Sequence, residues 1–331
     1  MPKTVEISHR TIIFTVLFLL SLWFVYQIKD IILLLFVAVI LMSALTPFVD
    51  WLQKYHIPRG LAIFFIYLFV WALAGSLIAT VIPGLIDQSG KLIRVLPVSL
   101  SQIELFNTHQ QEISQEILAR LGSLPEGLIK FSVGLFSNIL GVVTTLVISF
   151  YLLLERNKLD RYLALLLGPD KPEKAKRIIN EIEHRLGRWV RGELFLMIAV
   201  GTFTYFGLVI LGVDIPLPLA VLAGLLEIVP NIGPTISAVP AILVALTINP
   251  LTALATLALY ILIQQLENNL LVPKVMEKAT GVNPLVSILA LMVGFKIAGP
   301  AGAVLSIPII LVAQIIAAEV FSSHRLEGLT Q

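Results

Sequence analysis

The sequence predicts an all-α protein: a polytopic transmembrane helical bundle with two Gly/Pro-broken helical hairpins, re-entrant or discontinuous, in its C-terminal half. Of the 331 residues, 57% are hydrophobic and only 13% are charged, and the mean hydropathy is +0.94. Soluble domains carry about 25% charged residues, so this chain has too little charge for a water-exposed surface. The charges also cluster, which leaves long uncharged runs, and proline and glycine interrupt the last of these runs.

The composition excludes several classes of function. The 23 Lys and Arg residues nearly balance the 21 Asp and Glu residues, which argues against a nucleic-acid binder. The chain has no cysteine, so disulfides, thiolate metal sites and cysteine nucleophiles are excluded. No HExxH, GxSxG or Gly-rich phosphate loop occurs, and the five histidines lie outside or at the edges of the apolar runs. We therefore expect no enzyme, no metal site and no cofactor.

Five uncharged runs predict membrane-spanning helices, because a helical crossing of the hydrocarbon core needs about 20 apolar residues. These runs are residues 11–28, 31–49, 60–86, 131–154 and 194–213. The first could be a signal peptide, since Lys3 and Arg10 precede it. Its apolar run is long, however, and no small-residue cleavage pattern follows, so we expect an uncleaved helix.

The charges of the connecting segments predict the orientation in the cell membrane. Residues 155–193 contain ten Lys or Arg residues, whereas residues 87–130 contain four, together with five acids. Basic segments stay in the cytoplasm, so the N-terminus should be cytoplasmic. The expected parts are three N-terminal helices (1–86), an extracytoplasmic amphipathic helical insert (87–127), a fourth helix (128–154), a cytoplasmic basic amphipathic segment (155–193) and a C-terminal transport region (194–331).

The basic segment should form an amphipathic helix. Four apolar side chains recur on one helical face and four arginines lie near them: Ile178, Ile182, Leu186 and Trp189, with Arg177, Arg185, Arg188 and Arg191. Such a helix can lie on the anionic inner leaflet of the membrane, or it can be a docking surface for a partner.

The C-terminal region has a different pattern, in which apolar pieces are too short to cross the membrane alone. Residues 228–266 are uncharged but contain prolines at 230, 234, 240 and 250. The 14-residue pieces 216–229 and 235–248 would each span roughly 21 Å as helices, less than the ~30 Å core. A second broken region has pieces at 284–295 and 300–318. Paired short apolar segments broken by Gly and Pro point to the binding site of a transporter.

Each break has a Gly-Pro pair, Gly233-Pro234 and Gly299-Pro300. Proline fits the first turn of a helix, where its missing N–H costs nothing, and glycine permits a sharp bend before it. Each pair should therefore begin a helix inside the membrane, facing protein or a water-filled cavity. Small residues at close-packing spacing indicate tight helix packing or a sliding surface: Ala220 with Gly224, and Gly294 with Ala298 and Gly302.

Ionisable residues within these apolar segments are the main functional candidates, because charge at membrane depth is costly. Glu227 precedes the first break and Lys296 lies at the second, so the two could form a structural ion pair or bind a cation or proton and a polar solute. Glu267 ends the polar run 264–269, which could instead be a helix end in water. The predicted solute- or ion-binding residues are Glu227, Pro230, Asn231, Gly233, Pro234, Gln264, Glu267, Asn268, Asn269, Lys296, Gly299 and Pro300.

Three stretches resemble the signature of the AI-2E (autoinducer-2 exporter) family of bacterial membrane proteins. They are LAGLLEIVPNIGP at 222–234, ENNLLVPKV at 267–275 followed by GVNPL at 281–285, and GPAGAVLSIP at 299–308. Asn231, Glu277 and Asn283 depart from the common pattern. The resemblance implies a permease-like protein that forms homo-oligomers, with a pentamer as the expected form. It leaves the solute open, since members are linked to export of the quorum signal autoinducer-2, to sodium–proton exchange or to sporulation.

Taken together, these patterns predict a secondary transporter that exports a small polar metabolite, possibly like autoinducer-2 in chemistry, on a proton or sodium gradient. Its expected partners are the solute, the coupling ion H⁺ or Na⁺, and membrane lipids. One alternative is a monovalent cation/proton antiporter that uses Glu227 as the exchanging carboxylate. The other is a membrane scaffold or interaction protein, which would give no reason for the broken helices.

The predicted orientation can be tested with single cysteines, because the chain has none of its own. On intact cells, an impermeant maleimide should label a cysteine at Ser114, in the extracytoplasmic insert, and should not label one at Asn180. Labelling after permeabilisation checks that both sites are reactive. The opposite pattern on intact cells would invert the topology.

Overall fold

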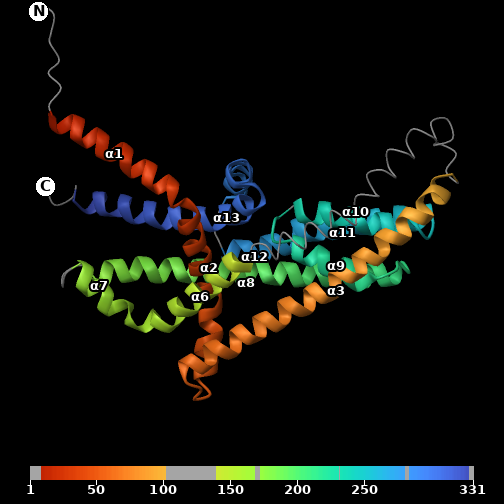
Figure 1. The fold of residues 1–331 in the computed structure, drawn as a ribbon, viewed down its shortest axis with the longest axis horizontal. Coiled ribbons are helices and arrows are strands. Elements are labelled where there is room, and N and C mark those ends of the chain that lie inside the picture. The colour runs from red at the N-terminus through yellow and green to blue at the C-terminus, as the bar shows by residue number, and fades with distance from the viewer. Residues whose placement is uncertain (1–8, 102–138, 168–171, 231, 280–282, 328–331) are drawn as a thin grey trace, which may run out of the picture.

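The computed structural model describes residues 9–101, 139–167, 172–230, 232–279 and 283–327 (Figure 1). Every regular element in these ranges is a helix. Seven of the described helices are long and apolar enough to cross a membrane. The predicted all-α, multi-span fold class is thereby confirmed.

Four helices form the N-terminal part. They are α1 (His9–Gln27), α2 (Lys29–Gln53), α3 (Arg59–Ser101) and α6 (Ile139–Glu155). The third expected crossing ended at residue 86, but α3 continues without a break to residue 101. The rest of the expected insert, residues 102–127, lies outside the described residues, as does the beginning of the expected fourth crossing.

The apolar faces of α2, α3 and α6 pack on one another. Val49, Ile63 and Leu153 are fully buried at their centre, and the Tyr67 hydroxyl donates to Ser149 Oγ at 2.7 Å between α3 and α6. In contrast, α1 projects away from the other helices (Figure 1), and its apolar side chains are exposed along its length. The surface of α1 is therefore available to lipid or to other chains.

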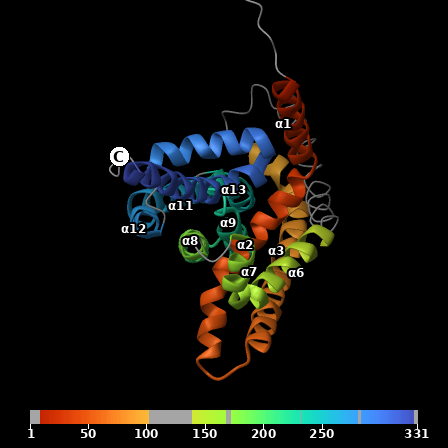
Figure 2. The same ribbon diagram turned by 90° about the vertical axis from the view of Figure 1, so that its left-hand side faces the viewer.

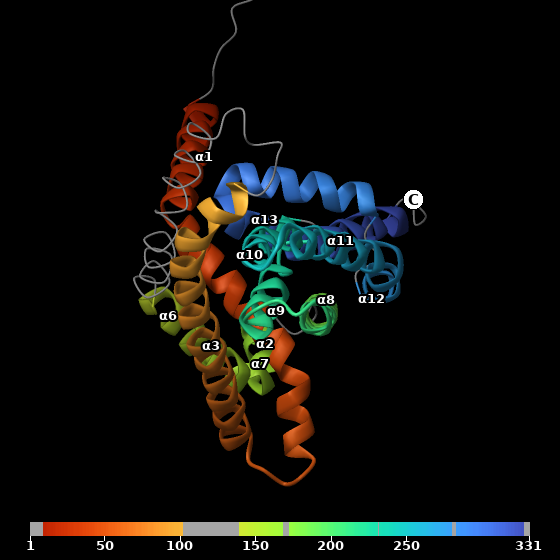
Figure 3. The ribbon, with the colours of Figure 1, turned by 90° about the vertical axis from the view of Figure 1, so that its right-hand side faces the viewer.

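The middle of the chain contains a short 3₁₀ turn and two helices, α7 (Leu159–Leu167) and α8 (Pro172–Ile210). The basic segment and the fifth expected crossing are not separate elements, because α8 is one helix of 39 residues. At about 1.5 Å per residue, α8 is roughly 58 Å long. It runs along the longest axis in Figure 1 and is seen end-on in Figures 2 and 3, with α2 and α3 on one side and α12 on the other.

Four short helices, a π-helical turn and one long, bent helix complete the described C-terminal part. They are α9 (Pro216–Leu226), α10 (Ile232–Leu246), α11 (Pro250–Leu266), the π-helical turn η3 (Glu267–Leu271), α12 (Val272–Ala279) and α13 (Pro284–Glu327). Apolar residues of α9, α10 and α11 form a core with α8, which includes Leu208, Leu219 and Ala241. α8 is therefore the element that both halves of the chain share.

The amphipathic face of α8 is buried within the protein. Leu186 and Trp189 pack against Ile40 of α2 and Leu311 of α13. This differs from the expectation of a helix lying on the inner leaflet. The apolar stripe continues along the same face beyond Trp189, so the helix does not end where the basic segment ends. Its apolar face is covered by α2 and α13.

The first break lies between α9 and α10. These helices have 11 and 15 residues, short as expected, but the break precedes Gly233-Pro234. This pair instead occupies the first turn of α10, where proline is tolerated. A Cβ atom on Gly233 would overlap the carbonyl oxygen of Leu226, so the end of α9 packs directly on this turn. Pro240 lies inside α10 without interrupting it.

The second break lies within α13, at the predicted Gly299-Pro300. Ala298 and Gly299 have non-helical backbone angles, and Gly299 has φ 61° and ψ −147°, a conformation that glycine adopts without strain. The two arms of α13 fold back on one another (Figure 3), and they cross so closely that a Cβ on Gly302 would overlap the carbonyl oxygen of Gly294. Here the small residues serve close helix packing.

The contact at Gly233 predicts a strong effect of a single methyl group. Gly233→Ala should lower the free energy of unfolding by about 1–3 kcal/mol, because the backbone must move to admit the Cβ. The purified protein in detergent should therefore melt at a lower temperature. Gly75→Ala is the matched control, since a Cβ at Gly75 of α3 meets nothing within 4 Å. Equal melting temperatures for the two variants would contradict this packing.

Candidate functional site

Three helix ends lie close together beside the middle of α8. The chain reverses direction between α8 and α9, between α9 and α10, and between α10 and α11, and these four helices share one core. The C-terminal end of α9, the first turn of α10 and the C-terminal end of α11 therefore lie at the same level. Each of these ends carries candidate polar residues.

A close crossing of α8 and α9 fixes the position of this level along α8. A Cβ on Gly224 would lie 2.6 Å from the carbonyl oxygen of Met197, and the nearest atom of Gly201 is 3.4 Å from it. Glu227 follows Gly224 by about one turn, and Glu193 precedes Met197 by about one turn of α8. Because the two helices run in opposite directions, both glutamates are carried to the same end of the crossing.

The side chains of Glu193, Glu227 and Glu267 are buried near one another at this point. Their residues are 3%, 0% and 1% exposed, respectively. The Glu227 and Glu267 carboxyl groups are within hydrogen-bonding reach of each other, and Glu193 is close enough to act electrostatically on both. Gln264 Nε2 donates to Glu267 Oε2 at 3.2 Å. We refer to these three residues as the carboxylate cluster.

The carboxylate cluster lacks the partners that usually accompany buried acids. In the described part of the chain, no hydrogen-bond donor reaches either carboxyl oxygen of Glu193 or Glu227. A hydrogen bond between Glu227 and Glu267 requires a proton on one of them, because an ionised carboxylate only accepts. The repulsion among three such groups is relieved by a proton or a cation. The arrangement is therefore chemically suited to binding and releasing positive charge.

The geometry of the cluster favours a proton over a metal ion as its ligand. Among the described residues, no group of three or more His, Cys, Asp or Glu side chains is arranged so that it could hold a metal ion. The close contact is instead pairwise, between Glu227 and Glu267. Two carboxyl groups in contact are the arrangement that shares one proton.

The local backbone at Glu267 is unusual. Glu267 begins a π-helical turn that runs to Leu271 and joins α11 to α12. π-turns are rare, and they occur frequently at functional sites, since the extra residue redirects side chains. The turn buries Glu267, whereas Asn268 and Asn269 are exposed, and Asn269 Nδ2 only bonds Gln265 Oε1 at 3.0 Å.

Part of the predicted site is thus brought together. Glu227, Glu267 and Gln264 meet at the cluster, and Gly233 and Pro234 are buried in the adjoining turn of α10. Pro230 is half-buried in the break before that turn. Asn231 lies outside the described residues.

Other predicted residues lie elsewhere. Lys296, Gly299 and Pro300 belong to the hairpin of α13, which packs against α2 and α8. The Lys296 side chain is exposed, and no ion pair between it and Glu227 occurs in the described ranges. The pairing expected from the two breaks is therefore replaced by the contact between Glu227 and Glu267.

The sequence analysis missed Glu193, which it placed at the end of the basic segment. A signal was present in the sequence. Leu186, Trp189, Leu196 and Val200 recur at helical spacing, and Glu193 is the single charged residue in the same stripe. A carboxylate in the middle of an apolar helix face is a candidate for function.

Two further buried polar groups lie in the core of α8–α11. The hydroxyls of Thr204 on α8 and Tyr260 on α11 are buried and have no hydrogen-bond partner with acceptable geometry among the described residues. Thr204 follows Glu193 by 11 residues, and Tyr260 precedes Glu267 by seven, so each shares a helix face with a glutamate. Polar atoms therefore continue from the cluster into the core.

Comparison with known proteins gives a consistent picture. The profile of the AI-2E family transporter matches residues 12–322. The protein named "Putative transport protein YueF" from Bacillus subtilis is 28% identical over 294 residues, with 82% of this chain and 79% of that protein covered. YhhT of Escherichia coli, named in the same way, is 27% identical over 305 residues, with 88% and 85% covered. With its membrane-spanning helices and a match over nearly its whole length, the chain is a multi-pass membrane protein of the AI-2E transporter family.

Proposed function

We propose that the protein is a proton-coupled secondary transporter of a small polar solute, similar in chemistry to autoinducer-2, and that the carboxylate cluster is its coupling site. The observation that supports this proposal is the burial of Glu193, Glu227 and Glu267 near one another, with no basic partner in the part of the chain that the structure describes. Such an arrangement costs stability, and inside a membrane protein buried ionisable groups are typical of proton and ion pathways.

The backbone around the cluster supports transport. The chain leaves regular α-helical geometry between α9 and α10 and at the π-turn after α11, and such backbone occurs at membrane depth only where it is covered by protein or faces a water-filled path. Discontinuous helices of this kind form the solute and ion sites of many secondary transporters. The coincidence of three irregular positions with three glutamates favours one combined site.

The hydroxyls beyond the cluster suggest where a solute would bind. Thr204 lies about 16 Å along α8 from Glu193, on the same face. Thr204 and Tyr260 offer donors and acceptors without a net charge, which suits a hydroxyl- or carbonyl-rich solute.

In the proposed proton cycle, the only covalent bond that forms and breaks is an O–H bond. A proton from one side of the membrane binds to one oxygen of the Glu227–Glu267 pair and is shared between the two groups. Rearrangement of the broken helices opens the pair to the other side, where the proton leaves and the solute moves in exchange. Because the proton relieves the repulsion in the cluster, its binding supplies the difference in free energy between the two states.

The orientation and assembly are part of the same proposal. The basic N-terminal half of α8 supports a cytoplasmic N-terminus, as the excess of Lys and Arg in residues 155–193 indicates. The exposed apolar surface of α1 is compatible with contacts between copies of the chain, and we propose a homo-oligomer, with the pentamer that the family resemblance implies.

Removing the charge of Glu227 should uncouple transport from protons. In liposomes loaded with a pH-sensitive dye, an autoinducer-2 gradient should drive proton movement by the native protein. Glu227→Gln should reduce it to the level of protein-free liposomes, because an amide cannot exchange a proton. Glu181→Gln, on the side of α8 exposed to solvent, is the matched control. Full proton coupling in Glu227→Gln would make Glu227 structural, and a response to NaCl but not to autoinducer-2 would identify a cation/proton antiporter.

Stability provides a second test that needs no solute. Gln at position 227 can donate an N–H to Glu267 without a shared proton. Glu227→Gln should therefore melt at the same temperature as the native protein or higher, with a free energy of unfolding raised by up to about 1 kcal/mol. Glu227→Ala leaves a cavity and should melt lower. If Glu227→Gln is destabilised as strongly as Glu227→Ala, the carboxylate is held in place by structural interactions, and the coupling role fails.

A further inference from the structure

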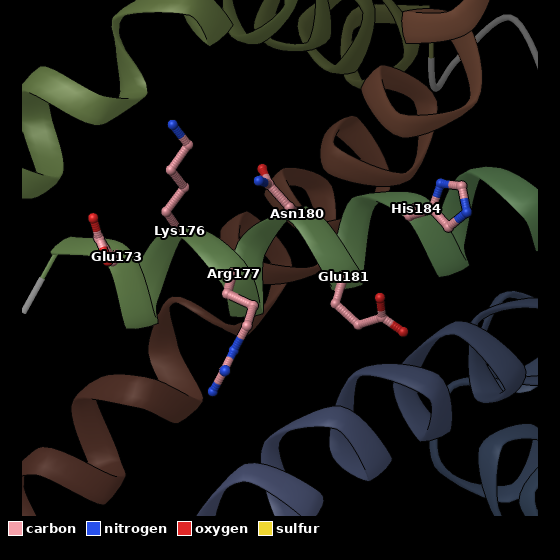
Figure 4. A pocket seen from close by; sticks show the side chains of 6 residues that line it. All are labelled: Glu173, Lys176, Arg177, Asn180, Glu181 and His184. Atoms are coloured by element: carbon pink, nitrogen blue, oxygen red, sulfur yellow. The ribbon is translucent and has the colours of Figure 1, made fainter.

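A second polar site lies on another side of α8, where it crosses α2. A pocket of about 330 Å³ opens between the two helices, and it is lined by Asp50 of α2 and by Asn180, Glu183, His184 and Arg191 of α8, among others. Its volume is in the range of small-molecule sites. The pocket adjoins a wider opening along α8, which shares Asn180 and His184 with it (Figure 4).

The acids that line this pocket are already neutralised. Asp50 Oδ1 lies 3.4 Å from Arg59 Nη1, and Glu183 Oε2 lies 2.7 Å from Arg156 Nε. Both arginines stand outside the lining of the pocket. Each acid therefore belongs to an ion pair whose net charge is zero.

The basic residues of the pocket have no such partners. Neither Arg191, which lines it, nor Arg188, one turn earlier on α8, forms an ion pair in the described part of the chain. The Nε atom of Arg188 is buried without an acceptor. The two guanidinium groups are close enough to repel one another. A partly buried pair of unpaired arginines is costly unless an anion binds to it.

Neutral donors also line the pocket. Asn180 Oδ1 accepts from Arg156 Nη2 at 2.5 Å, which fixes the orientation of the amide and leaves its NH₂ group as a donor. In Figure 4, Asn180 and Lys176 project from one side of α8, whereas Arg177 and Glu181 project from the other. The imidazole of His184 can supply another N–H. Guanidinium, amide and imidazole donors around a small cavity match the oxygens of a tetrahedral or planar oxyanion.

We propose that this pocket binds a phosphate group, carried either by a soluble ion or by the headgroup of an anionic lipid. Arg191 would bind two oxygens with its planar fork, and Arg188 would add charge from the neighbouring turn. The pocket is independent of the carboxylate cluster, because Arg191 and Glu193 are two residues apart and therefore point about 200° apart around α8. The two sites therefore share no residue, and each can be altered by substitution without removing a residue of the other.

The soluble source is tested with radiolabelled inorganic phosphate and the full-length protein in nanodiscs of phosphatidylcholine. The lipid source is tested by native mass spectrometry of protein taken from nanodiscs that contain phosphatidylglycerol. In at least one of these two arms, the native protein should bind, and Arg191→Gln and Arg188→Gln should weaken binding about tenfold or more. Arg177→Gln, a change of the same charge on an exposed arginine of the same helix, should have no such effect.

Further variants separate the possible explanations. Arg191→Lys keeps the charge but lacks the planar fork, so it should fold like the native protein and bind with intermediate affinity. Glu227→Gln should leave phosphate or lipid binding unchanged, so that this proposal and the transport proposal can fail separately. Phosphate binding identifies a soluble ligand, and retention of phosphatidylglycerol alone identifies a lipid headgroup. The proposal is overturned if neither probe binds, or if Arg177→Gln weakens binding as much as Arg191→Gln.

Discussion

The architecture depends on the close approach of α8 and α9. At Gly224 the two backbones are separated by little more than van der Waals contact, with no room for a side chain on either helix at the crossing. A larger residue there would push α9 outward, and Glu227 would move away from Glu193 with it. The remaining helices follow from this contact, since α10 packs its first turn on the end of α9 and α11 packs on α10. Two glycines on neighbouring helices thus position acids that lie several residues away.

The membrane imposes the second constraint. Backbone groups at a helix end must be covered by protein or water, so a helix that ends inside an apolar region must end against other parts of the protein or against water. The end of α9 and the first turn of α10 meet this requirement by packing on each other at Gly233, and the break at Gly299 meets it separately through the close packing of Gly294 on Gly302. The same covering removes water from three carboxyl groups, which weakens the fold and strengthens their mutual interaction. Natural proteins keep such arrangements where function requires them.

Much of this could be predicted from local sequence. Runs of apolar residues gave the membrane-spanning helices, and the prolines near residues 230 and 300 indicated the short pieces and both breaks, because these signals depend on neighbouring residues only. Glu227 and Glu267 were recognisable as charges in apolar surroundings. Their contact was not predictable, since it depends on which helices pack together and on their rotation. For the same reason the ion pair of Lys296 with Glu227, one of the two possibilities considered, does not occur in the described ranges, and Glu193 was not recognised as a neighbour of Glu267.

The continuity of α8 links the two polar sites physically. A hydrogen-bonded helix of 39 residues transmits displacement along its length, because a kink would require it to give up backbone hydrogen bonds. Arg191, on the side that faces α2, and Glu193, on the side that faces α9 and η3, are separated by only one residue of this helix. Any shift of α8 against α2 therefore changes the surroundings of both residues together. Both crossings are close, since a Cβ on Gly187 of α8 would lie 2.5 Å from the carbonyl oxygen of Ser43 in α2, and a Cβ on Gly224 of α9 would lie 2.6 Å from that of Met197 in α8. A displacement of α8 is therefore passed to α2 and α9 alike.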